Sequence, residues 1–183
     1  MKKSFKIILF FIFTLFLFTD NLFAVNFQID QGKIRIKLPP GWSDGGVINV
    51  ENKDNTPIKI RVYIADWEYS DKDGSKRFLA PGTSKMSCAD WIKFYPADFT
   101  IPARGKQKVN FVVGVPQDAV GAHYAVLFFE AETGTIYDQS KGINVKVYHR
   151  LASLFYVEPE GTIKKQAELS DFKIEESQGK IKV

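Results

Sequence analysis

The stretch KVNFVVGVPQDAVGAHYAVLFFE, residues 108–130, decides the fold. Apolar residues alternate along its first part, 109–115, which is the period of a strand with one buried face. Pro116 and Gly121 then mark a corner, because these residue types favour turns. Residues 125–129 are apolar at every position, which is typical of a strand that is covered on both faces. Two strands joined by such a corner predict an antiparallel β-sandwich.

Further strand signals lie on either side of this stretch. Apolar and polar residues alternate along 34–38, which ends at a Pro-Pro-Gly break, and again along 143–148. Two more apolar runs, 47–50 and 58–64, flank a turn-forming cluster at 52–57 and therefore predict a hairpin-like pair. No stretch of a dozen residues shows a helical apolar stripe, so the sequence predicts an all-β protein.

Together these strands predict an immunoglobulin-like antiparallel β-sandwich over residues 25–158. A chain of this length buries about two-thirds of its unfolded surface, which is enough for one core. Cys88 is the only cysteine, so no intramolecular disulfide can form and packing must supply the stability. We expect Cys88 to be a small buried apolar group, with an intermolecular disulfide as the alternative.

Residues 1–24 have the pattern of a signal peptide. Three lysines precede the apolar run 7–18, which is too short to span a bilayer, and Leu22-Phe23-Ala24 offers a cleavage site. An uncleaved anchor is the alternative, because Leu22 and the preceding polar pair fit a cleavage site less well. We therefore expect an exported, periplasmic protein that meets the membrane only through this segment.

Residues 159–183 form a tail that differs in pattern from the sandwich. A linker precedes two predicted strands, 166–174 and 180–183, which flank a turn at 175–179. Two short strands make at best a marginal hairpin in water. The tail therefore packs on the sandwich, stays mobile, or begins a truncated second β domain, which is the interpretation we favour. Self-association through this tail is a further expectation.

Turn and core positions over about residues 25–157 share a pattern with a known family. The positions are Val50-Glu51-Asn52, Pro57-Ile58 with the strand to Trp67, Pro81-Gly82-Thr83, Val113-Gly114-Val115-Pro116, and 121–128. This pattern resembles the N-terminal domain of the PapD-like group, the immunoglobulin-like periplasmic chaperones of pilus assembly. The resemblance implies a non-enzymatic module that binds a protein partner, such as a pilin-like subunit, by strand pairing at a sheet edge.

The resemblance also implies partner-binding residues. In such chaperones, two basic residues on the first and last strands hold a subunit's terminal carboxylate, and alternating apolar residues of the last strand complete the subunit's sheet. The matching positions here are Arg35 on the first strand, Arg150 on the last strand with Lys146 as a weaker candidate, and Ile143, Val145 and Val147. The run 150–156 departs from the family's last strand, because its Arg-Pro ending is missing.

Each assignment has a plainer alternative. The residues Ile143, Val145 and Val147 also fit the domain's own core, and the two arginines also fit solvated strand positions. A second functional class is a module that binds glycans or the cell wall, because flat aromatic rings stack on sugars. The rings in question, which also suit core packing, are Trp42, Trp67, Trp91, Tyr63, Tyr69 and Tyr95.

The sequence offers little for catalysis, metal binding or nucleic-acid binding. His123 and His149 do not lie at a ligand spacing with Cys88 or with a carboxylate pair, and no nucleophile elbow or phosphate-binding glycine loop occurs. Removal of residues 1–24 would lower the formal net charge from +4 to +2, which gives little affinity for phosphate. We therefore expect no cofactor, no metal, no nucleic-acid partner and no enzymatic activity.

Overall fold

The computed structural model describes residues 26–70, 74–163, 175–177 and 180–182. This part of the chain consists mainly of β-strands, as the sequence predicts, with one short 3-10 turn. None of its helical residues belongs to a helix long and apolar enough to cross a membrane. The predicted signal segment, 1–24, lies outside the described residues.

The strands follow one another along the chain with short connections. They are β1 (Phe27–Ile29), β2 (Lys33–Leu38), β3 (Ser43–Asn52), β4 (Ile58–Tyr69), β5 (Lys76–Leu79), β6 (Ile92–Tyr95), β7 (Asp98–Ile101), β8 (Lys106–Gly114), β9 (His123–Asp138), β10 (Ile143–Pro159), β11 (Glu175–Ser177) and β12 (Lys180–Lys182), and the 3-10 turn η1 (Ala89–Trp91) precedes β6.

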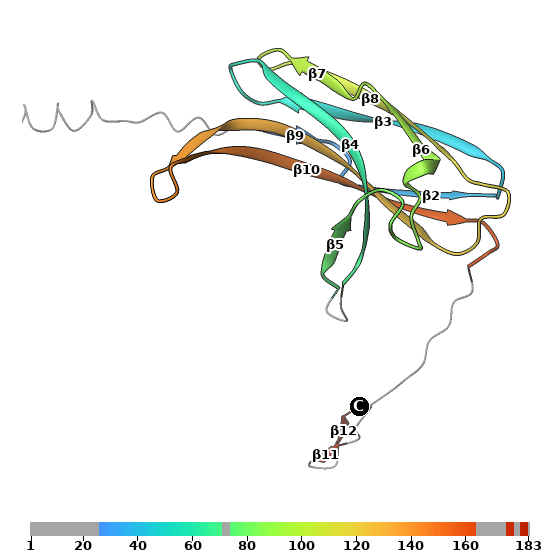
Figure 1. Cartoon of the computed structure of the whole chain (residues 1–183). Helices are drawn as coiled ribbons and strands as arrows, with labels where there is room; N and C mark the ends of the chain where they lie inside the picture. The colour runs from blue at the N-terminus through green and yellow to red at the C-terminus, as the bar shows by residue number, and fades with distance from the viewer. Residues whose placement is uncertain (1–25, 71–73, 164–174, 178–179, 183) are drawn as a thin grey trace, which may run out of the picture.

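Two sheets face each other and form the sandwich (Figure 1). One sheet has four strands in the order β1-β3-β8-β6. The other has six, in the order β2-β10-β9-β4-β5, with β7 also paired to β4. Neighbouring strands are antiparallel except β2 and β10, which are parallel. The predicted immunoglobulin-like antiparallel sandwich is therefore confirmed.

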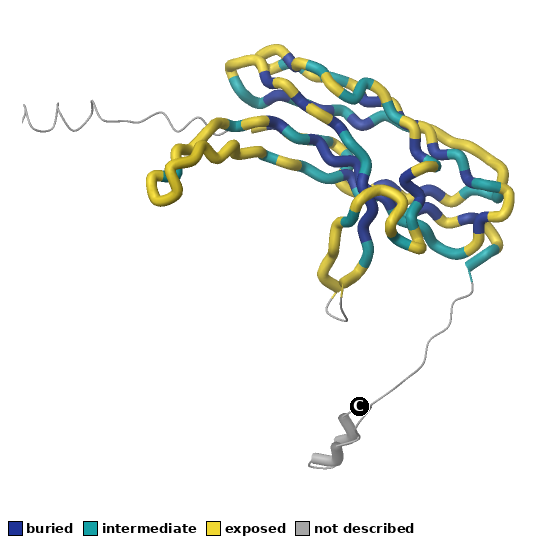
Figure 2. Tube along the Cα trace, in the orientation of Figure 1, coloured by how far each residue is buried: buried dark blue, intermediate teal, exposed yellow. Residues whose placement is uncertain are grey.

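The core lies between the two sheets and is built from alternate residues of the facing strands (Figure 2). Ile48 and Val109 enter it from the four-stranded sheet, and Ile60, Leu127 and Phe155 enter it from the six-stranded sheet, all without exposed surface. The alternation that predicted these strands therefore also predicts which of their residues fill the core.

A second apolar cluster lies on the outer face of the six-stranded sheet. Trp67 is fully buried there, with its ring centroid 4.8 Å from that of Tyr124 and 4.9 Å from that of Tyr156. Val126 and Phe128 join this cluster from β9. Because the neighbouring residues of β9 face the core, the run 125–129 is covered on both faces, as its uniform apolar character predicts.

The predicted hairpin of 47–50 with 58–64 is wrong. β3 pairs with β1 and β8, whereas β4 pairs with β9, β5 and β7, so the two strands lie in different sheets. The buried Asn52 explains the crossing, because its side-chain amide donates to the carbonyl oxygens of Thr56, at 2.8 Å, and Pro102, at 2.9 Å. A turn-forming cluster in the sequence does not show whether the chain returns to the same sheet or crosses to the facing one.

The segment before η1 is held by a buried carboxylate. Asp66 accepts hydrogen bonds from the backbone N–H of Ser84, at 2.9 Å, and from the hydroxyl of Ser87, at 2.6 Å. Cys88 follows and is fully buried, as expected. Burial raises the pKa of the Cys88 thiol, and the nearby Asp66 adds to this effect. A buried protonated thiol is poorly placed for an intermolecular disulfide.

In the tail, β11 and β12 pair antiparallel. β12 falls within the second predicted strand, but β11 occupies residues that the sequence assigned to the turn. The first predicted strand, 166–174, lies outside the described residues.

Candidate functional site

The hairpin of β9 and β10 extends beyond the rest of the sandwich (Figure 1). The two strands pair from His123 opposite Val157 to Asp138 opposite Ile143. β4 pairs with β9 only as far as Glu130, so the more distal residues of β9 and β10 have only each other as strand neighbours in the described chain. We call residues 132–148, which form this projecting part, the arm.

β10 has one unpaired edge along the arm. β2 occupies this edge only from Leu154, opposite Lys33, to Pro159. The backbone N–H of Leu154 donates to the carbonyl of Gly32 at 3.0 Å, and the buried hydroxyl of Ser153 donates to the carbonyl of Gln31. Within the described residues, no strand pairs with this edge from 143 to 152. An unpaired edge presents backbone N–H and C=O groups that an incoming strand can bind.

The arm also exposes an apolar face. Leu151, Phe155 and Val157 on β10 contact the core, and side chains two residues apart share a face of a strand. The same face of the arm therefore carries Ile143, Val145 and Val147, which are 48%, 42% and 36% exposed. Ile136 lies opposite Val145 and is exposed as well.

This face is exposed because the four-stranded sheet ends before the arm begins. Next to the base of the arm, Phe27 of β1 contacts His149 across the sandwich, with ring centroids 5.1 Å apart. Beyond His149, every β10 residue of the arm is exposed (Figure 2). The alternative in which Ile143, Val145 and Val147 fill the domain's own core is therefore wrong.

Local hydrogen bonds shape the arm. At its tip, Asp138 accepts from the backbone N–H of Ser140 at 2.9 Å, and hydrogen bonds from Ser140 lower the pKa of the Asp138 carboxyl. At its base, Thr133 is the extra residue of a β-bulge, and its hydroxyl donates to the carbonyl of Val147 at 3.0 Å. Between them, Lys146 pairs with Glu132 at 3.2 Å, a hydrogen bond that raises the pKa of the lysine.

The structure does not bring Arg35 and Arg150 together. Arg35 lies opposite Tyr156 on β10, whereas Arg150 lies opposite Glu130 on β9. Six residues of an extended strand separate the two positions, which corresponds to about 20 Å. The two arginines therefore do not converge on a single terminal carboxylate. Arg150 lies beside the unpaired edge, and Arg35 lies beyond it.

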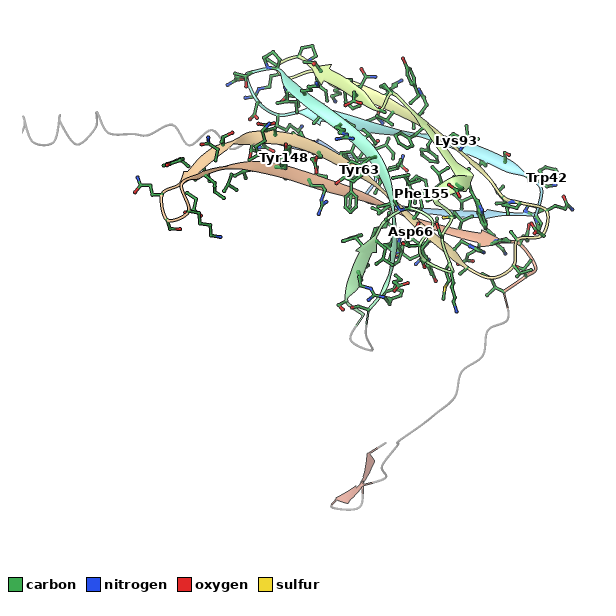
Figure 3. The ribbon with its side chains drawn as sticks, viewed as in Figure 1. Trp42, Tyr63, Asp66, Lys93, Tyr148 and Phe155 are labelled. Atoms are coloured by element: carbon green, nitrogen blue, oxygen red, sulfur yellow. The ribbon has the colours of Figure 1, made fainter. Side chains whose placement is uncertain are left out.

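The tryptophans do not form a common surface. Trp67 is buried, Trp91 is half-buried with its ring 4.2 Å from that of His123, and Trp42 is exposed. Trp42 lies at the opposite end of the sandwich from Tyr148 of the arm (Figure 3). The geometry gives no support to a glycan-stacking platform built from these three rings. In the described part of the chain, no three His, Cys, Asp or Glu side chains are grouped to hold a metal ion.

Two contributors to the site were missed in the sequence. Ile136 lies in a run rich in Gly and Thr beyond the uniformly apolar 125–129, where the strand signal weakens. Tyr63 donates a hydrogen bond to Glu130 at 3.1 Å and accepts one from Arg150 at 2.9 Å. The alternation along 143–148, after the turn 139–142, was a signal for the longer hairpin, whereas the contacts of Tyr63 depend on strand order.

Searches with the sequence found no matching family model and no matching curated protein. Solved structures do match. One is the chaperone–tip adhesin complex of CFA/I fimbriae, with a TM-score of 0.50 and 15% identity over 73% of this chain and 56% of that chain. A second is the Salmonella enterica SafA pilin in complex with the SafB chaperone, with a TM-score of 0.49 and 11% identity over 77% of this chain and 58% of that chain. A third is PapD-like domain 7 of human CEP192, with a TM-score of 0.45 and 15% identity over 81% of this chain and 92% of that chain.

The chain thus spans little more than half the length of the chaperone chains that it matches. At these identities the likeness concerns the fold, because one fold serves many functions. The sequence resemblance and the structural comparison agree on that fold. The described sandwich is PapD-like, with an immunoglobulin-like arrangement of strands.

Proposed function

We propose that this protein is a non-enzymatic binding module that takes up an extended segment of a partner protein at the unpaired edge of β10, over residues 143–152. One observation carries the proposal. Ile143, Val145 and Val147 lie exposed on one face of a strand whose outer backbone edge has no partner in the described chain. Strand addition uses both features, since the ladder supplies affinity and alternate side chains supply specificity.

The binding free energy requires both the exposed apolar side chains and the unpaired backbone edge. Burying the three side chains contributes about 1.5 to 3 kcal/mol each, or about 5 to 9 kcal/mol together. Association costs about 4 to 15 kcal/mol, so apolar burial alone does not hold a partner. Backbone hydrogen bonds along 143–152 must supply the remainder. The partner segment is therefore extended and alternately apolar.

The partner bound at 143–152 is a protein strand, because the same edge of β10 already pairs with a strand, β2, farther along. β2 occupies the same edge of β10 directly after Ser153, as a parallel strand. A segment added along the arm would continue the line of β2 and would satisfy the same kind of backbone groups. A lipid or a sugar chain has no regular series of N–H and C=O groups to do so.

The finer form of the proposal is a periplasmic, chaperone-like role with a pilin-like subunit as the partner. It is supported by the sequence resemblance, by the signal-peptide pattern of residues 1–24, and by solved neighbours that are chaperones in complex with an adhesin or a pilin. Purification of the protein from periplasm, followed by mass spectrometry, tests this form. A pilin-like subunit in stoichiometric amount supports it, and recovery without any such subunit contradicts it.

Peptide binding tests the edge itself. The probes are Gln-Thr-Thr-Val-Thr-Val-Thr-Val and the same residues in reverse order, with both ends blocked, so that one probe suits antiparallel and the other parallel pairing. We expect one of them to bind, as measured by calorimetry. Replacing with Pro a residue of that probe whose N–H points to β10 should abolish binding, because proline lacks the N–H of the ladder. This residue is the Thr opposite Lys146 in the antiparallel probe and the Val opposite Val145 in the parallel probe.

Matched protein variants locate the binding. Val145→Ser with Val147→Ser removes two exposed valines of the arm, and Val112→Ser with Val120→Ser removes two exposed valines elsewhere. We expect the arm pair to lose at least about tenfold in affinity, since each lost apolar contact contributes about 1.5 kcal/mol or more. The control pair should change affinity less than about twofold. Equal losses in both pairs would contradict the proposal.

A further inference from the structure

A row of alternating charge crosses the six-stranded sheet at the base of the arm. Arg61 on β4 lies opposite Asp98 on β7 and opposite Glu130 on β9. Glu130 in turn lies opposite Arg150 on β10. The row therefore reads negative, positive, negative, positive across four adjacent strands. Its first three members line a cavity of about 360 Å³ on the sheet.

The row ends on a cation at an unpaired edge. Arg150 lies within 143–152, where no described strand pairs with the outer side of β10. A strand added there would place a side chain directly beside Arg150. Opposite charges at such cross-strand positions stabilise a sheet, and like charges destabilise it. If the alternation of charge continues onto the added strand, the side chain beside Arg150 carries a negative charge.

Neighbouring aromatic residues hold Arg150 without neutralising it. Its guanidinium carbon, Cζ, lies 4.4 Å from the centre of the Phe128 ring, and one guanidinium nitrogen, Nη1, donates to the Tyr63 hydroxyl at 2.9 Å. That hydroxyl donates in turn to Glu130 at 3.1 Å, so Tyr63 bridges Arg150 and Glu130. No carboxylate of the described residues forms an ion pair with Arg150. A guanidinium carries five N–H donors, so several remain available.

Lys146 differs from Arg150 because it already has an acidic partner. It lies on the same face of β10, four residues before Arg150, but Glu132 of the arm already pairs with it at 3.2 Å. Tyr148, between them on that face, is not a basic residue. Arg150 is therefore the position along the unpaired edge at which a carboxylate from a partner gains most.

We infer that the partner segment carries an Asp or Glu opposite Arg150, at a fixed spacing from its apolar residues. The inference rests on the proposed strand addition and specifies its partner. Val147, Val145 and Ile143 lie three, five and seven residues from Arg150. A regular antiparallel partner strand therefore has its acid first and apolar residues three, five and seven positions later, and a parallel one has the reverse order.

The test compares blocked peptides that differ at the acid position. Glu-Thr-Thr-Val-Thr-Val-Thr-Val and its reverse are measured against the same peptides with Gln or Lys in place of Glu. A fourth version moves Glu two positions, so that it faces Tyr148. We expect the Glu peptide in the correct register to bind about fivefold more tightly than the Gln peptide, and the Lys peptide to bind most weakly. Blocked ends remove any contribution from a terminal carboxylate.

Two protein variants assign the effect. Arg150→Gln should abolish the preference for Glu over Gln, whereas Lys59→Gln removes a positive charge elsewhere on the sheet and should retain it. Equal binding of the Glu and Gln peptides to the unaltered protein would overturn the inference and leave the strand-edge proposal standing. Failure of every peptide to bind would overturn both. A preference that survives in Arg150→Gln would assign the acid to another cation.

Discussion

The two halves of β10 place apolar residues on the same face of the strand but differ in what covers that face. From Leu154 onward the strand runs between β2 and β9, and Phe155 and Val157 are fully buried against the facing sheet. From Ile143 to Tyr148 the strand has β9 as its only partner among the described strands, and every residue is exposed. The same face of one strand therefore serves as core in one half and as accessible surface in the other.

The difference shows that alternation specifies the face of a strand but not what covers that face. A strand with one apolar face needs a second layer, and β10 is covered only as far as His149, whose ring contacts that of Phe27. The apolar residues beyond that point lie beside an unpaired backbone edge. This combination suits a surface that binds another strand.

The largest expected effect lies in the buried half. Phe155→Ala should lower the free energy of unfolding by about 3 to 5 kcal/mol, because it removes a fully buried ring from the core. Urea denaturation, monitored by circular dichroism, measures the change. A loss below about 1 kcal/mol would show that the buried half contributes no more to stability than a surface position does.

A substitution at the boundary between the two halves of β10 should lower the free energy of unfolding by a smaller amount. Ser153→Ala removes the buried hydroxyl that donates to the Gln31 carbonyl just before β2 joins the edge. We expect a loss of about 1 kcal/mol, as for other buried hydrogen bonds. Faster hydrogen exchange at the first amides of β2 should accompany it. Unchanged exchange there would mean that Ser153 does not secure the start of β2.

Tyr156, on the outer face of the buried half of β10, should ionise at a higher pH than an ordinary tyrosine. Burial, together with a hydrogen bond that the Tyr156 hydroxyl donates to Tyr69, raises the pKa of Tyr156 to about 12 from its ordinary value of 10. The fold thus favours the protonated phenol, so this contribution to stability is present below pH 10 and is lost as the pH rises toward 12. Alkaline titration of tyrosine absorbance should show one late-ionising phenol fewer in Tyr156→Phe. A late phase of equal size in both proteins would contradict this assignment.

The smallest effect on stability is expected in the arm. Val145→Ala should change the free energy of unfolding by less than about 0.5 kcal/mol, because the side chain is exposed and lies outside the core. The same substitution should weaken peptide binding. A loss of stability comparable to that of Phe155→Ala would show that the arm packs against the domain after all.

Much of the fold follows from local sequence patterns. The alternation in 34–38 and 109–115 and the uniform apolar run 125–129 each correspond to an observed strand, because burial of one or both faces leaves a direct mark on the sequence. The crossing between β3 and β4 does not leave such a mark. It depends on the contacts of Asn52 with carbonyl groups up to 50 positions away in the chain.

The candidate site was predictable in its residues but not in its arrangement. Ile143, Val145 and Val147 stand out by alternation, yet their exposure depends on where the facing sheet ends. Arg35 and Arg150 were paired by resemblance, and only the register of β10 with β2 and β9 separates them. The charge row depends on the order of four strands, which no local pattern specifies.

Hydrogen exchange along β10 tests the account most directly. In the protein alone, amides of 144–152 that point to the unpaired edge should exchange quickly, whereas the amide of Leu154, bonded to Gly32, should be protected. Addition of the Glu-bearing peptide should protect the former group and leave the latter unchanged. Protection that appears elsewhere, for example along β6, with 144–152 unaffected, would contradict the claim that the arm is a strand-binding edge.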